Sequence, residues 1–275
     1  MKSRQDDSQL TLNTRKMYSI FFSKDRKNFL DQRNRDRLIA LRNKNPEAAY
    51  SFIYSSNLLD ESAKVELNNF CQRHRIEAVD FDTEIATDPY QSEKESKLFG
   101  FVRGELENWV GGNRGGNPAA ASDMLRYCPR VIKRCGAYVE LDTDVDLSSL
   151  PQRYNIKHPI IMPKESNDFI GVATKANGEI HEQAKQYLER FQDYIIEGYE
   201  IEKSDKGVEQ IDWDAPIMYE YFSQIPGADK SLTSFRSFIK NANIDDFLKA
   251  IRPHLKGQII VLKDTFHYLS LQKKI

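Results

Sequence analysis

Ionisable side chains gather at the end of an expected strand over residues 136–147, which reads GAYVELDTDVDL. Alternate residues of an extended chain share a face, so four of its polar residues are expected to point one way: Tyr138, Glu140, Asp142 and Asp144. Several ionisable groups on one face are costly to bury unless something compensates their charge. A divalent cation, which prefers oxygen ligands, is the simplest compensation. The spacing therefore predicts a metal site at this strand end.

The Asp-x-Asp spacing alone is weak support, because the chain contains it four times, at 80/82, 142/144, 144/146 and 212/214. The surroundings separate Asp142 and Asp144 from the other pairs. An expected helix upstream carries Asp123 and Arg126 on one face, three residues apart. Such a pair can also be a plain helical ion pair, which stabilises a helix only slightly. The spacing alone therefore leaves open whether Asp123 and Arg126 have a functional or a purely structural role.

The pattern from 121 to 144 resembles the metal-dependent glycosyltransferases of the GT-A fold. It is similar to the catalytic domain of the clostridial glucosylating toxins and to related bacterial effector glycosyltransferases. The family pattern is a helix with Ala-Ser-Asp-x-x-Arg, a glycine turn and a strand ending in Tyr-Leu-Asp-x-Asp. Residues 121–126 match the helix without a gap, and Gly136 supplies the turn. Looser likeness extends to four further segments: 17–22, 45–55, 167–170 and 213–218.

The resemblance implies roles for particular residues. Asp144 would ligate Mn²⁺ or Mg²⁺, Asp142 would hold the ribose and the water shell of the metal, and Asp123 with Arg126 would bind hydroxyls of the donor sugar. His267 could complete the metal shell or be structural. Further donor contacts are expected from four residues: Phe21, Ser122, Tyr138 and Asn167.

The chain also departs from the family pattern. Glu140 stands where the family has tyrosine, two residues before the first aspartate, and Tyr138 lies two residues earlier. The sequence leaves open which of the two takes the tyrosine's place. Phe21 is the nearest aromatic residue to the position of the family's uracil-stacking tryptophan. The carboxy-terminal Ser-Trp pair of the family is missing.

Alternating strand and helix patterns predict an α/β fold, an open mixed sheet flanked by helices, in one GT-A domain over 17–275. Residues 1–16 are expected to form a flexible arm. Strands are expected at 17–22, 48–54, 76–81, 168–173 and 257–262. Helices are expected at 28–45, 60–74, 98–110, 119–135 with a kink at Pro129, 180–197, 213–222 and 232–255.

Composition narrows the class of protein. Its 275 residues carry 40 Lys and Arg against 41 Asp and Glu, which argues against nucleic-acid binding by phosphate neutralisation. No run approaches the length of about 20 apolar residues that a membrane span requires. The amino terminus is polar and does not look like a signal peptide, so we expect synthesis in a cytoplasm. The three cysteines, Cys71, Cys128 and Cys135, are interpreted as reduced core thiols.

We therefore expect a metal-dependent enzyme that transfers glucose or N-acetylglucosamine from a UDP-sugar to an acceptor. The resemblance favours a side chain of a host protein as acceptor, transfer with retention of configuration, and export into a host cell as a toxin-like effector. One alternative is transfer to a polysaccharide or glycolipid. Another is an inactive domain that binds a nucleotide or a partner without turnover.

Overall fold

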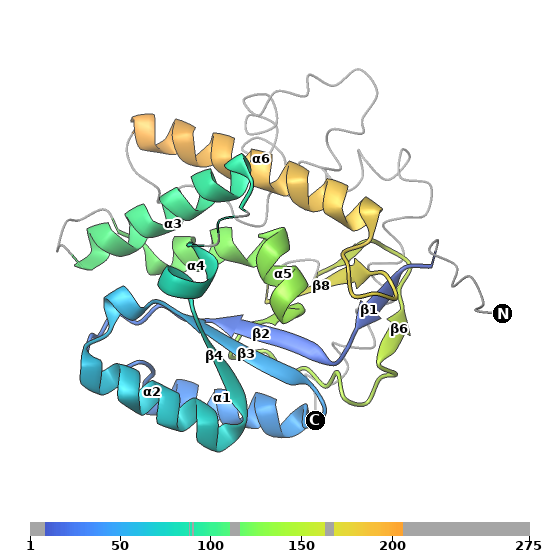
Figure 1. Ribbon diagram of the computed structural model, residues 1–275, viewed down its shortest axis with the longest axis horizontal. Helices are drawn as coiled ribbons and strands as arrows, with labels where there is room; N and C mark the ends of the chain where they lie inside the picture. Colours follow the sequence, from blue (N-terminus) through green and yellow to red (C-terminus); the bar gives the residue numbers. More distant parts are fainter. Residues whose placement is uncertain (1–8, 88, 90, 111–115, 163–167, 206–275) are drawn as a thin grey trace, which may run out of the picture.

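The computed structural model describes residues 9–87, 89, 91–110, 116–162 and 168–205. Within these ranges, eight strands form one mixed sheet in the order β4-β3-β2-β5-β8-β1-β6, and β7 pairs with β8. Two layers of helices cover its faces, α1 and α2 below and α3 to α6 above (Figure 1). The predicted α/β architecture, an open sheet flanked by helices, is confirmed.

The parallel half of the sheet contains β2 (Lys16–Ile20), β3 (Ala49–Tyr54), β4 (Ile76–Asp80) and β5 (Ala137–Val139). β2 pairs with β3 and β5, and β3 pairs with β4, all in parallel. The connections are α1 (Gln32–Lys44) and α2 (Glu61–His74). Asp31 and Asp60 accept from backbone amides in the first turns of these two helices, which fixes where the helices begin. The expected strands and helices of this half are thus present, with ends shifted by a few residues.

The antiparallel half is built from β8 (Phe169–Thr174), β1 (Thr11–Asn13), β6 (Arg153–Asn155) and β7 (Ile160–Ile161). β8 runs antiparallel to β5 and to β1. The expectation of a flexible arm is wrong for residues 11–16, because β1 pairs on both sides and Thr11 and Leu12 are buried. Strands of two or three residues give too little alternation to be recognised in a sequence.

The upper helices are α3 (Glu93–Val110), α4 (Pro118–Arg126), α5 (Pro129–Cys135) and α6 (Glu182–Asp205). One kinked helix was expected over 119–135, and this expectation is wrong: two helices are present. Cys128 is extended, with φ −76° and ψ 119°, since a residue before proline avoids helical geometry. Pro129 then begins α5, a position where its missing N–H costs nothing.

Two short helical turns complete the described elements, a 3₁₀ turn at Ser56–Leu58 and a π turn at Phe81–Ile85. The helices expected at 213–222 and 232–255 and the strand expected at 257–262 lie outside the described residues. None of the helices in the described ranges is long and apolar enough to cross a membrane.

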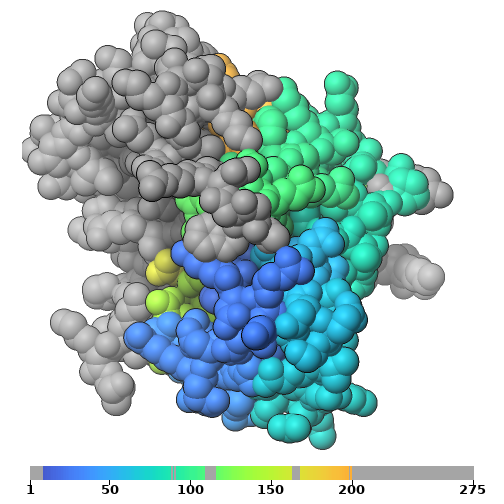
Figure 2. Space-filling view, turned by 90° about the vertical axis from the view of Figure 1, so that its left-hand side faces the viewer, coloured from blue at the N-terminus to red at the C-terminus, as the bar shows by residue number. Residues whose placement is uncertain are grey.

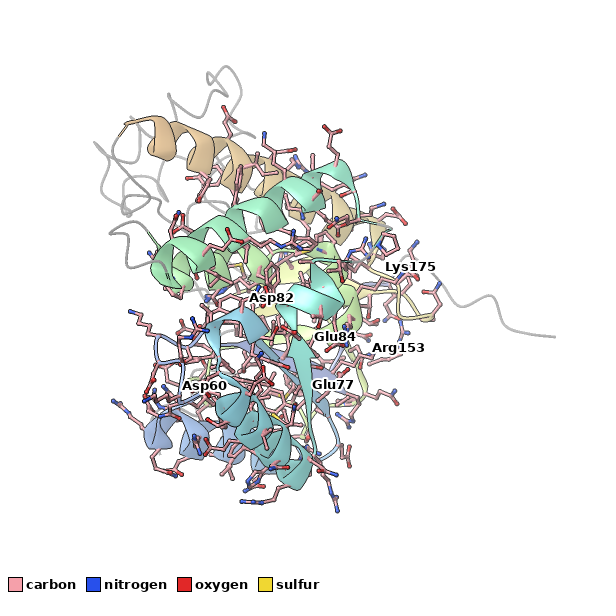
Figure 3. All side chains as sticks on the ribbon, turned by 60° about the vertical axis from the view of Figure 1, so that its left-hand side comes forward. Asp60, Glu77, Asp82, Glu84, Arg153 and Lys175 are labelled. Atoms are coloured by element: carbon pink, nitrogen blue, oxygen red, sulfur yellow. The ribbon has the colours of Figure 1, made fainter. Side chains whose placement is uncertain are left out.

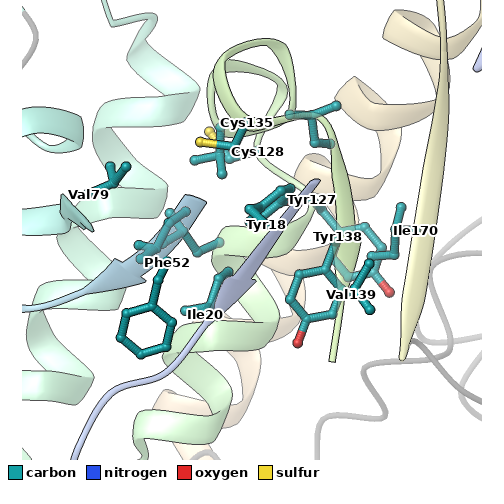
Figure 4. Close-up of a cluster of buried hydrophobic side chains, with 14 of the residues drawn as sticks. Tyr18, Ile20, Phe52, Val79, Tyr127, Cys128, Cys135, Tyr138, Val139 and Ile170 are labelled. Carbon is teal, nitrogen blue, oxygen red and sulfur yellow. The ribbon is translucent and has the colours of Figure 1, made fainter. Parts of the chain in front are cut away.

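The core lies between the sheet and both helical layers. Aromatic residues fill much of it. The rings of Tyr18 and Tyr138, on adjacent parallel strands, pack edge to face with their centroids 5.5 Å apart (Figure 4). The three cysteines are unpaired and buried, as expected for core thiols. On the surface, the amino-terminal residues in blue and α2 in cyan lie next to each other on the lower part of the face in Figure 2.

Candidate functional site

The candidate site begins with the way in which α4 is held beside β5. Asn117 caps α4 by accepting from the amides of Ala119 and Ala120, and its own amide donates to the buried Glu105 carboxylate at 2.8 Å. At the other end, the Tyr18 hydroxyl donates to the carbonyl oxygen of Arg126 at 3.1 Å. These contacts tie both ends of α4 to neighbouring elements. The side chains of its last turn are therefore placed against β5.

Arg126 is the centre of a buried polar cluster. Its Nη2 lies 2.9 Å from Asp123 Oδ1, 3.2 Å from Glu140 Oε2 and 3.3 Å from Ser122 Oγ. Its guanidinium carbon lies 4.3 Å from the centroid of the Tyr138 ring, a cation–π contact. The Tyr138 hydroxyl is hydrogen-bonded to Glu140 Oε2. The structure thus brings together four of the predicted site residues and adds Glu140 to them.

Burial and charge set the protonation states in this cluster. Burial opposes the charge of Arg126, but Tyr138, Asp123 and Glu140 around it outweigh that effect, so the pKa of Arg126 is raised. Burial is also the main reason why the pKa of Tyr138 lies well above its ordinary value. Arg126 therefore remains a cation at neutral pH, and Tyr138 remains a hydroxyl that donates to Glu140.

Tyr138 and Glu140 are both part of the cluster, and the Tyr138 hydroxyl is hydrogen-bonded to the Glu140 carboxylate. β5 ends at Val139, and the amide of Glu140 donates to the carbonyl oxygen of Asp168 at 2.7 Å, just before β8. The chain then turns, with the Thr143 amide bonded to the Glu140 carbonyl oxygen. Glu140 is the last residue of this segment that keeps the alternation with Tyr138.

Asp142 and Asp144 do not share a face with Tyr138, which corrects the expectation of a strand through residue 147. Because the chain turns after Glu140, both carboxylates instead meet cations of α1. Arg37 Nη2 lies 4.0 Å from Asp142 Oδ2, and Lys44 Nζ is paired with Asp144 Oδ1. Both aspartates are about half exposed.

Asn45 anchors the chain just beyond these aspartates. It is fully buried, and its amide nitrogen donates to the carbonyl oxygens of Leu41 and Val145, at 2.9 Å in both cases. Its Oδ1 accepts from the amide of Leu147 at 2.7 Å. In the sequence, Asn45 before Pro46 predicted only the end of a helix. A buried asparagine needs hydrogen-bond partners for its side-chain amide, and here the backbone of Val145 and Leu147 provides them.

The donor chemistry at Asp142 and Asp144 fits a hard divalent cation. Both are accessible carboxylate oxygens, the ligand type that such cations prefer. Each is paired with a side-chain cation of α1, Arg37 or Lys44, which a metal ion would have to displace. Among the described residues, however, no group of three or more His, Cys, Asp or Glu is arranged to hold a metal. A cation held by these two carboxylates alone would need oxygens of a diphosphate and water in its remaining positions.

The other predicted site residues are placed as follows. Phe21 directly follows β2, is partly buried against the core, and its amide donates to Ile53 O at 3.0 Å. Ser122 is buried beside Arg126. Asn167 and His267 lie outside the described residues. Lys44, Arg37 and Asn45 were not predicted as part of the site, since their contacts join segments about 100 residues apart in the chain.

Comparisons with solved structures find proteins of similar fold. The chain is similar to the solved structure titled PaToxG glycosyltransferase, with 18% identity, a TM-score of 0.52 and coverage of 97% of this chain and 78% of that chain. A bacterial N-acetylglucosamine transferase, NleB, gives 12% identity, a TM-score of 0.42 and coverage of 90% and 96%. A search of curated proteins gives no match. The first likeness supports the GT-A-like fold.

The family assignment rests on the sequence match. The model of glycosyltransferase family 88 matches residues 2–171, more than half of the chain, and this stretch includes α4, β5 and both aspartates of the 142/144 pair. The chain therefore belongs to glycosyltransferase family 88 and is a glycosyltransferase.

Proposed function

We propose that the protein transfers glucose or N-acetylglucosamine from a UDP-sugar to a side chain of a host protein, with retention of configuration and with help from Mn²⁺ or Mg²⁺. The observation that carries the proposal is the Arg126 cluster beside β5, in a chain of glycosyltransferase family 88. Sugar transfer follows from the family. The donor, the metal and the acceptor are our proposal.

The donor site is assigned to the carboxyl ends of the parallel strands, where open α/β sheets bind their ligands. Asp123 accepts hydrogen bonds from sugar hydroxyls, and Arg126 donates to sugar oxygens. Phe21, which follows β2, stacks on the uracil ring. Ser122 and Asn167 complete the contacts with the donor. These roles agree with the chemistry of the groups, since a carboxylate accepts from hydroxyls and a guanidinium donates in a fixed planar arrangement.

Asp144 would hold the divalent cation directly, Asp142 would hold the ribose and the water around the cation, and His267 is a candidate for a further ligand. When bound, such a cation neutralises the charge of the departing diphosphate. Transfer breaks the bond between the anomeric carbon and the diphosphate oxygen. A bond from the acceptor oxygen to the same face of that carbon replaces it, and the acceptor proton passes to the leaving diphosphate.

The donor is tested by titrating the protein with UDP in the presence and absence of Mn²⁺ in a calorimeter. The proposal predicts heat of binding that depends on the metal and decreases strongly for Asp144→Ala. UDP binding that is the same with and without Mn²⁺ would contradict the metal role. No binding of UDP at all would contradict the donor.

The acceptor is tested by incubating the protein and a UDP-sugar with a eukaryotic lysate and analysing the products by mass spectrometry. The proposal predicts a hexose or N-acetylhexosamine added to protein side chains, and no addition with Asp144→Ala. Sugar found only in lipid or polysaccharide would contradict the protein acceptor and favour the alternative transferase. A protein secreted into a host cell as an effector would meet such acceptors there.

A further inference from the structure

One carboxylate, that of Glu140, connects the strand to the buried arginine of α4. Glu140 Oε2 lies 3.2 Å from Arg126 Nη2 and also accepts from the Tyr138 hydroxyl. We propose that Glu140 is a positioning residue, which holds Arg126 and Tyr138 in the arrangement that meets the donor sugar. This inference rests on the proposed function, because it assigns the role of Glu140 within that donor site.

The contacts of the Arg126 guanidinium come from two different elements, the helix α4 and the β5 segment. Asp123 and Ser122 belong to α4, as Arg126 does, so their contacts orient the guanidinium within its own helix. Glu140 and Tyr138 belong to the β5 segment, so their contacts orient it relative to the strand. A long arginine side chain has several rotatable bonds, and contacts from two elements limit its rotation more than contacts from one.

Tyr138 depends on the same carboxylate. Its ring lies against the guanidinium of Arg126, and its hydroxyl is buried and protonated, since burial raises its pKa. A buried hydroxyl that loses its acceptor carries a free-energy penalty, so removing Glu140 would favour a movement of the ring. A hydrogen bond to a carboxylate is also about twice as strong as one to a neutral group. The charge of Glu140 is therefore expected to matter, as well as its shape.

Glu140→Gln tests this expectation because glutamine keeps the shape of the side chain and removes the charge. Affinity is measured by calorimetry with Mn²⁺, separately for UDP-glucose, UDP-N-acetylglucosamine and UDP. We expect the affinity for the UDP-sugar that binds the wild type to fall about tenfold, the loss of roughly one charge-assisted contact. The affinity for UDP should not change, because UDP has no sugar for Arg126 to meet.

Glu77→Gln is the matched control. Glu77 Oε1 lies 3.2 Å from Arg134 Nη2, and Glu77 Oε2 accepts from the Ser51 hydroxyl at 2.7 Å, so this carboxylate also joins an arginine to a hydroxyl. It lies with Glu84 at β4 and the turn that follows (Figure 3), and both carboxylates pair with Arg134 of α5. The control should bind both UDP and the UDP-sugar as the wild type does.

Two further variants separate positioning from a general loss of structure. Tyr138→Phe removes the hydroxyl that donates to Glu140 and should reduce UDP-sugar affinity without changing UDP affinity. In an Arg126→Lys background, Glu140→Gln should cause less than a twofold further loss, because its effect passes through Arg126. Urea unfolding of each variant checks that the fold is intact.

The possible results separate a failure of the positioning role of Glu140 from a failure of the proposed function. If the wild type binds the UDP-sugar and Glu140→Gln binds it with the same affinity, the positioning role is overturned. The proposed function then still stands. An equal loss of UDP and UDP-sugar affinity would overturn the positioning role as well, since that indicates a general disturbance. A wild-type protein that binds neither UDP nor UDP-sugar would overturn the proposed function itself.

Discussion

Lys44 at the end of α1 is ion-paired with Asp144, which lies 100 residues further along the chain, after β5. The contact joins a helix on the lower face of the sheet to the acidic pair that the sequence singles out. Arg37, two helical turns earlier on α1, lies 4.0 Å from Asp142. The carboxylates assigned to a metal thus stand against two side-chain cations.

If Asp144 binds the metal, Lys44 competes with it. Lys44→Ala should therefore tighten Mn²⁺ binding in the presence of UDP, by up to about fivefold, because an exposed ion pair is worth at most about 1 kcal/mol. The free energy of unfolding should change by less than about 1 kcal/mol. Lys64→Ala is the control, since Lys64 forms an exposed pair with Glu61 on α2. Weaker Mn²⁺ binding in Lys44→Ala would show that Lys44 supports the site instead.

We expect Asn45 to contribute more to stability than either ion pair of Asp142 and Asp144. Its three buried hydrogen bonds hold Leu41, Val145 and Leu147 together. Asn45→Ala leaves buried backbone groups without these partners and should lower the free energy of unfolding by about 3 kcal/mol, measured by urea denaturation. Asn69→Ala, an exposed change on α2, should have an effect of less than about 0.5 kcal/mol. Similar values for the two variants would contradict the anchoring role.

Gly136 is a position that requires glycine. Its φ is 94°, and a Cβ added there would lie 2.3 Å from the carbonyl oxygen of Lys16. Gly136→Ala should therefore destabilise the protein by on the order of 3 kcal/mol and disturb the start of β5. Gly100→Ala is the control, because nothing lies within 4 Å of the added Cβ in α3. Alanine favours a helix there, so this variant should be as stable as the wild type or slightly more stable. Thermal denaturation of both variants provides the comparison.

The burial of the three thiols should make them unreactive in the native protein. Burial raises the pKa of Cys71 and of Cys128 to about 12 and that of Cys135 to about 11. The native protein should therefore not react with a thiol reagent within minutes at pH 8, whereas all three cysteines should react in urea.

The same shifts link stability to pH. Unfolded thiols release protons near their ordinary pKa of 9.0, while the folded ones keep theirs until about pH 11 to 12. The free energy of unfolding should therefore fall as pH rises above 9. Rapid labelling of a thiol at pH 8 in the native state would contradict the buried positions.

The sequence predicted the regular half of the fold well. β2, β3, β4, α1 and α2 have clear patterns of buried residues, so their existence followed from periodicity. β1, β6 and β7 were missed because two or three residues show no period. The break at Pro129 was seen as a kink, since a proline signals a disturbance without saying whether the chain bends or starts a new helix.

The candidate site was predicted only in part, because some of its contacts follow from local spacing and others from how distant segments pack. The Asp123 and Arg126 contact followed from helical spacing, and it is present. The direction of Asp142 and Asp144 did not follow, because it depends on a turn after Glu140 that has no glycine or proline to announce it. The contacts of Lys44 and Asn45 depend on how distant segments pack, and local spacing carries no information about that.

The most direct test of the account is the release of nucleotide from a panel of UDP- and GDP-sugars incubated with the purified protein and Mn²⁺, without an acceptor. The account predicts slow hydrolysis of UDP-glucose or UDP-N-acetylglucosamine, which is lost in Asp142→Ala and in Asp144→Ala and remains in Glu77→Gln. Hydrolysis of a GDP-sugar alone, or of a UDP-sugar at the same rate in the aspartate variants, would contradict it.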